Sequence, residues 1–151
     1  MVKTQEPSDA LDKQVGGSHY KKGIQPFEIS MANGHDAAVH AMNKYMTRHR
    51  RKDPEKGYED CQKAHHIAGI RLAMIQRHGP PYVQRYRPVP IQEYEESNEL
   101  GIADACAVYT IEAWYERSNV DHQKWHDHIR KLIREAARSA YPETFNEEDF
   151  V

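Results

Sequence analysis

The sequence of 151 residues predicts an all-α protein, a small helical bundle without a substantial sheet. The first reason is that apolar residues recur at alternating steps of three and four along two long segments, as on the buried face of an amphipathic helix. The second is that glycine and proline stand where helices of ordinary length would begin or end. The clearest seam consists of Tyr58, Cys61, His65, Ala68, Leu72 and Ile75.

Helix boundaries follow from the residues that flank each periodic segment. Pro26 suits a first helical turn, and Asn33-Gly34 interrupts the pattern that follows it. Gly79 is a natural helix stop, with Pro80-Pro81 directly behind it. The last apolar face consists of Trp125, Ile129, Leu132 and Ala136. We therefore expect helices near residues 26–32, 35–51, 55–78, 101–118 and 120–140.

Composition changes along the chain suggest five segments. The polar beginning lacks periodicity and is expected to be disordered, and the acidic end is expected to be a loose tail. The proline-rich stretch between the periodic segments is expected to be an extended linker. The segments are a disordered N-terminal segment 1–15, a first helical domain 16–79, a linker 80–90, a second helical unit 91–140 and an acidic tail 141–151.

The two halves resemble each other, which suggests an internal duplication of a three-helix unit. Residues 91–97 (IQEYEES) match residues 24–30 (IQPFEIS), and residues 121–126 (DHQKWH) match residues 60–65 (DCQKAH). An Asp-Ala pair starts the middle helix of each half, at Asp36-Ala37 and Asp104-Ala105. If the halves are copies, residues 35–78 should superpose on 102–139 with Asp60 and Asp121 matched. Chance resemblance between amphipathic helices is the alternative.

The bulk properties exclude several classes of protein. A formal net charge of −2 does not indicate a general nucleic-acid-binding surface, so no specific nucleic acid is expected as a partner. Only 38% of the residues are hydrophobic, so the core is thin and a homo-oligomer is expected. The two cysteines, Cys61 and Cys106, read as small core residues rather than a disulfide framework. Neither a membrane span nor a signal peptide is recognisable, so we expect a cytoplasmic protein without a membrane partner.

A candidate anion site lies on the second predicted helix and the turn after it. Lys44 and Arg48 stand one turn apart on the same helix face, and the small Ala37 and Ala41 continue that face. Such a face would leave room for a phosphate-bearing ligand. The alternative is a solvated basic face. In the second half Glu112 falls near the place of Lys44, so only the first half would carry the ligand.

The motifs of this region resemble a family of small phage-encoded nucleotide kinases. The pattern covers about residues 15–78, and one branch of the family, from podophages of enteric bacteria, phosphorylates deoxynucleoside monophosphates without a P-loop or a metal. If the chain is phage-encoded, it would act in the host cytoplasm. The matching positions are Ser18-His19-Tyr20, Lys44-Tyr45, Arg48, Lys52, Asp60, Lys63 and Ala64.

The resemblance implies a kinase that transfers a phosphoryl group to a (deoxy)nucleoside monophosphate. Nucleotides would be its partners and a nucleoside triphosphate its phosphate donor, with no required cofactor and no metal site. Since no P-loop string occurs, cations would neutralise the phosphates. His19, Lys44 and Arg48 would be catalytic. The substrate-binding residues would be Ser18, Tyr20, Tyr45, Lys52, Asp60 and Lys63.

Individual roles follow from side-chain chemistry. Tyr45 or Tyr20 could stack on a base, and His19 could bond a phosphate or carry a proton. Asp60 could hold a ribose hydroxyl or orient Lys63. The structural alternatives are an Asp60–Lys63 pair along one helix, a Tyr45 at the edge of the core and a His19 that ties down the entering loop.

Two other functions fit parts of the sequence. The family often has Gly-Asn where this chain has His40-Ala41, which favours a non-catalytic nucleotide- or signal-binding helical protein. His35-Asp36 also resembles the centre of a metal-dependent HD-type phosphohydrolase, although His19 and Asp60 fit its remaining ligand positions poorly. Asp121, His122 and His126 would make a usable metal half-site.

Overall fold

A computed structural model describes residues 23–85 and 87–151. Within these residues the protein is all-α and contains no strand, so the predicted fold class is confirmed. None of the described helices is both long and apolar enough to cross a membrane. The elements are α2 (Pro26–Asn33), α3 (Ala37–Arg48), the 3₁₀ helix η1 (His49–Arg51), α4 (Pro54–His78), α5 (Ile91–Ser97), α6 (Ile102–Tyr115), α7 (His122–Ala140) and the 3₁₀ helix η2 (Glu147–Asp149).

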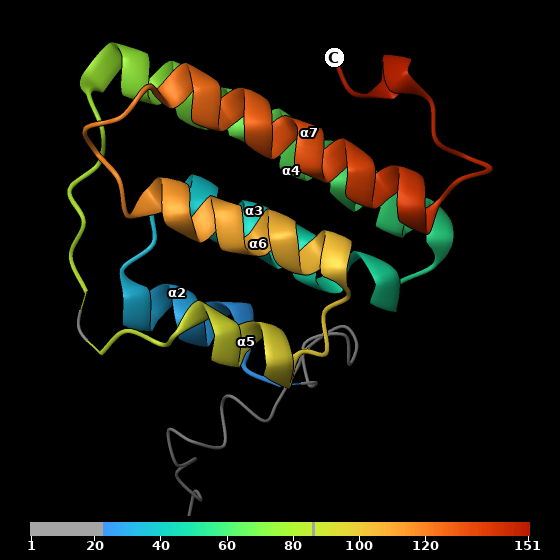
Figure 1. Cartoon of the computed structure of the whole chain (residues 1–151), viewed down its shortest axis with the longest axis horizontal. Helices are drawn as coiled ribbons and strands as arrows, with labels where there is room; N and C mark the ends of the chain where they lie inside the picture. Colours follow the sequence, from blue (N-terminus) through green and yellow to red (C-terminus); the bar gives the residue numbers. More distant parts are fainter. Residues whose placement is uncertain (1–22, 86) are drawn as a thin grey trace, which may run out of the picture.

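The helices form two layers of three, α2–α3–α4 and α5–α6–α7 (Figure 1). Within each layer the consecutive helices contact each other. Between the layers α3 packs on α6 and α4 packs on α7, each pair running antiparallel (Figure 1). Apart from η1, which occurs in the first half, both halves therefore have the same order of α-helices and corresponding packing partners, as a duplication requires. Superposition of the two halves stays a prediction.

The core lies between the two layers. All six residues of the predicted α4 seam are buried, which confirms the periodicity argument. Trp114, Tyr94 and Tyr115 are the largest fully buried side chains, and α5 and α6 contribute them. The face of α7 is confirmed only in part, because Trp125 and Leu132 are partly exposed at its edge.

The turn between α2 and α3 is tight. Gly34 has φ +67°, and a Cβ there would lie 1.7 Å from the carbonyl oxygen of Gln84. The Asp36 carboxylate accepts a hydrogen bond of 2.9 Å from the Val39 amide and so caps α3. Helix α3 consequently begins after Asp36 rather than at residue 35.

The predicted linker is anchored at one point, and the tail predicted to be loose is packed. In the linker, Asn33 exchanges hydrogen bonds of 3.0 and 2.6 Å with the Val89 backbone, which joins this stretch to α2. In the acidic tail, the aromatic Tyr141 and Phe150 are buried in the core, and Tyr58 donates to Asp149 over 2.7 Å. Burial of two aromatic rings outweighs the acidity of the tail.

The prediction that both cysteines are core residues is wrong for Cys106. Cys61 is fully buried, as expected for a small core residue. Cys106 is exposed because its side of α6 borders an open groove with Leu132 of α7 instead of the core.

The arginine-rich turn joins the two layers. His49 is fully buried, with Nε2 2.8 Å from Asp104 and Nδ1 2.9 Å from the Tyr141 hydroxyl. Arg50 donates to the same Asp104 over 2.7 Å, and Arg51 donates to Asn98. These three residues of η1 therefore brace the first unit against the second.

A buried histidine makes stability depend on pH. Burial, followed by repulsion from Arg130 and Arg134, lowers the pKa of His65 from 6.5 to about 3. As pH falls below 6.5 the unfolded chain takes up a proton on His65 that the folded chain refuses until about pH 3, so stability falls across this window. Between about pH 7.5 and about pH 5.5 we expect the parent to lose about 1 kcal/mol more unfolding free energy than His65→Gln.

Urea unfolding of both proteins at the two pH values measures this difference. Glutamine can still accept the hydrogen bond that Arg134 donates to His65 over 3.2 Å, so the variant retains that contact. Equal losses in the parent and His65→Gln would show that His65 titrates normally in the folded protein.

Candidate functional site

Six of the predicted site residues meet at the contact between α3, η1 and the first turns of α4. The Tyr45 ring is their centre, with Lys44 Nζ 4.8 Å, Arg48 Cζ 5.0 Å and Lys63 Nζ 5.7 Å from the ring centroid. Lys52 reaches Asp60 from the end of η1. We call Lys44, Arg48, Lys52 and Lys63 the cation cluster. Ser18, His19 and Tyr20 lie outside the described residues.

Asp60 orients two of these cations. Its carboxylate is 1% exposed and accepts from Arg48 Nε over 3.0 Å and from Arg48 Nη2 over 3.3 Å. Lys52 Nζ lies 3.4 Å from the same carboxylate. The alternative of an Asp60–Lys63 pair is not what the structure has: Asp60 faces α3, whereas Lys63 pairs with exposed Glu59 at 3.4 Å. Three of the four cations thus share two carboxylates and Lys44 pairs with neither, which leaves the site positively charged.

Lys44 is the cation least compensated by its surroundings. It pairs with no carboxylate in the described part of the chain, and its ammonium lies over the Tyr45 ring. Partial burial, followed by repulsion from Arg48, lowers the pKa of Lys44, and Asp60 offsets this only in part. A bound anion would relieve both the desolvation of the ammonium and the repulsion among the cations.

Removing the Asp60 charge should lower stability. In Asp60→Asn, Arg48 and Lys52 lose their buried partner while keeping their mutual repulsion. We expect the free energy of unfolding to fall by about 1–3 kcal/mol, less than for a fully buried pair because both cations are partly exposed. The matched control is Glu59→Gln, which removes an exposed i,i+4 pair and should change stability by under about 0.5 kcal/mol. Equal effects in chemical denaturation would contradict the role of Asp60.

His40 belongs beside the cluster, although sequence reasoning registered it only as a departure from the family pattern. It stands one turn before Lys44 on α3, and its Nδ1 lies 2.7 Å from Ser30 Oγ. Burial, followed by repulsion from Lys44 and His35, lowers the pKa of His40. Its i,i+4 spacing to Lys44 was the signal that could have found it.

The residues suggested for a metal centre have separate partners. His35 Nε2 bonds Glu112 on α6, whereas Asp36 caps α3 and pairs with Arg71 at 3.1 Å. His122 Nδ1 accepts from the Trp114 indole over 3.0 Å. In residues 23–85 and 87–151, no three His, Cys, Asp or Glu side chains are grouped to hold a metal ion.

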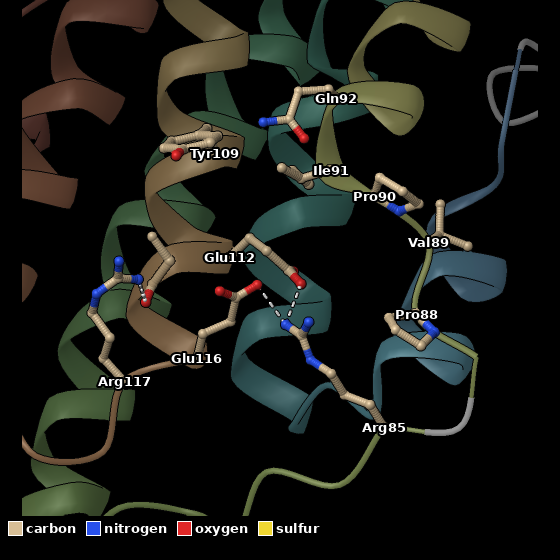
Figure 2. A pocket seen from close by; sticks show the side chains of 11 residues that line it. Arg85, Pro88, Val89, Pro90, Ile91, Gln92, Tyr109, Glu112, Glu116 and Arg117 are labelled. Carbon is tan, nitrogen blue, oxygen red and sulfur yellow. Dashed lines mark hydrogen bonds and ion pairs between the residues drawn. The ribbon is translucent and has the colours of Figure 1, made fainter.

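The second unit carries the opposite charge at the corresponding place. If Asp36 is matched with Asp104, Lys44 and Arg48 fall on Glu112 and Glu116, also one turn apart. Figure 2 shows Arg85 pointing at both carboxylates beside a pocket of about 380 Å³. This charge inversion restricts a two-cation anion site to the first unit.

Comparisons of the chain with models of protein families, with curated proteins and with solved structures found no match.

Proposed function

We propose that the cation cluster binds the phosphates of a nucleotide and that the protein is a nucleotide kinase acting on a (deoxy)nucleoside monophosphate. The observation that supports this most is Lys44, a partly buried ammonium without a carboxylate partner in the described residues and surrounded by three further cations. Positive charge accumulated in a partly desolvated place is what phosphate recognition requires.

The proposed reaction joins two substrates. A phosphate oxygen of the monophosphate attacks the terminal phosphorus of a nucleoside triphosphate, and the bond from that phosphorus to the bridging oxygen breaks. Two nucleoside diphosphates result. Such transfer depends mainly on positioning and charge neutralisation. We assign these tasks to Lys44 and Arg48, with Lys52 and Lys63 as further phosphate contacts and Asp60 as the residue that positions Arg48.

Three residues before the described part of the chain keep the roles that the family resemblance implies. His19 would be catalytic, and Ser18 and Tyr20 would contact substrate. Neither a metal nor another cofactor enters the proposed reaction, because the cations neutralise the phosphates. We further propose that the protein is a homo-oligomer, because its core is thin. We also propose that it is cytoplasmic.

Non-catalytic nucleotide binding is the second candidate. Two observations favour it: Arg48 and Lys52 already bond Asp60, and His40-Ala41 replaces the Gly-Asn of the family. Cations that stay bonded to Asp60 could bind a phosphate group, yet be unable to move with the negative charge that shifts during phosphoryl transfer.

One assay separates the candidates. The full chain is incubated with each deoxynucleoside monophosphate and a nucleoside triphosphate, and the products are separated by charge. A kinase yields diphosphates with the parent and much less with Lys44→Ala. If calorimetry detects nucleotide binding but no diphosphate forms, the binding protein replaces the kinase. The absence of both binding and product would refute both candidates.

A further inference from the structure

An exposed aromatic ring packs on His40, which stands one helical turn before Lys44 of the cation cluster. Phe27 lies in the first turn of α2 and is 66% exposed. Its ring centroid lies 4.8 Å from that of His40, with the two planes inclined by 38°. One side of Phe27 therefore packs on His40, and much of the ring still faces solvent.

The imidazole ring of His40, on which Phe27 packs, is held in place by hydrogen bonds. Ser30, which is 8% exposed, lies 2.7 Å from Nδ1 of His40 and 3.1 Å from Nδ1 of His35. His35 is in turn bonded to Glu112 on the other layer. Since α2, α3 and α6 all contribute, the position of His40 is set by the fold rather than by local rotamer choice.

The same α3 stripe connects this ring pair to the phosphate site. His40, Lys44 and Arg48 follow one another at intervals of four residues, which place neighbouring side chains about 5–6 Å apart. This order matches that of a nucleotide. The aromatic surface corresponds to the base, the gap of one helical turn to the sugar and the cations to the phosphates.

Tyr45 is less suited to hold a base. Lys44, Arg48 and Lys63 all lie within 6 Å of its ring centroid, so the ring is already engaged in cation–π interactions. Phe27 has no cation over its ring in the described contacts and is more exposed.

We propose that Phe27, supported by His40, is the stacking platform for the base of a nucleotide whose phosphates bind the cation cluster. This inference rests on the proposed function and extends it, because it makes the site selective for nucleotides over inorganic polyphosphates. A stacking platform reads the flat face of a base, so it tolerates all four bases.

The test is calorimetric titration of the full chain with deoxynucleoside triphosphates and, separately, with inorganic triphosphate. Phe27→Ala should weaken nucleotide binding roughly 5- to 100-fold and leave triphosphate binding within about twofold. Phe27→Trp should retain nucleotide binding, with its indole fluorescence quenched by the base. The matched control is Ile102→Ala, which truncates a side chain that is 87% exposed in the second unit and should change neither affinity.

The failures of the two proposals differ. If Phe27→Ala binds nucleotides like the parent while Lys44→Ala loses both ligands, the platform is wrong and the phosphate site stands. Equal weakening of both ligands by Phe27→Ala would also overturn the platform, because it would show an indirect effect on the cations. If Lys44→Ala keeps both ligands, the phosphate site is wrong, and the platform falls with it.

Discussion

Replacing Gly57 with alanine is expected to destabilise the protein by about 3 kcal/mol, the upper range for overpacking a rigid site. A Cβ at Gly57 would lie 2.3 Å from the carbonyl oxygen of His49 and 2.1 Å from the Tyr141 hydroxyl. Neither atom can easily give way, because His49 is bonded to Asp104 and Tyr141 is buried and bonded to His49. The clash thus reverses the gain of up to about 1 kcal/mol that alanine usually brings inside a helix.

Gly101→Ala is the matched control for this prediction. Gly101 precedes α6 with φ −69°, and nothing lies within 4 Å of a Cβ built there. We expect a change in stability of under about 1 kcal/mol. Urea unfolding monitored by circular dichroism compares both variants with the parent. A Gly57→Ala protein as stable as the parent would show that η1 does not pack closely on α4.

Periodicity predicted the α4 seam well because all its residues obey one local rule. The seam from Tyr58 to Ile75 depends only on helical geometry and on the helix having one covered side. The end of the chain could not be predicted in this way. Burial of Tyr141 and Phe150 depends on α4 lying close to the end of α7, and that placement comes from contacts distant in sequence.

The candidate site likewise has one part that local helix geometry predicts and another part that depends on contacts distant in sequence. The placement of Lys44 and Arg48 on one face follows from a spacing of four within one helix. The partner of Asp60 does not, because the choice between Lys63 on its own helix and Arg48 on α3 depends on how α4 is rotated about its axis. Likewise, no local pattern shows that Arg50 of the basic turn is bonded to Asp104 of the second unit.

The structure also decides which cation gives the cleaner test of phosphate binding. Arg48→Ala would leave the buried Asp60 with only Lys52, so lost affinity and lost stability would be mixed. Lys44 bonds no carboxylate in residues 23–85 and 87–151, and its ammonium contacts a ring. Its removal also reduces repulsion among the remaining cations. Lys44→Ala should therefore fold as well as the parent or slightly better.

Lys44→Ala is expected to weaken the binding of nucleoside triphosphates about 10- to 100-fold, the loss of one charge-assisted hydrogen bond of about 1.5–3 kcal/mol. The matched control is Lys131→Ala, which removes an exposed lysine on α7 and so tests whether overall charge alone matters. Titration calorimetry at two salt concentrations measures both variants, and the affinity of Lys44→Ala should depend less on salt than that of the parent. If Lys44→Ala and Lys131→Ala bind alike, the cation cluster is only a solvated basic face.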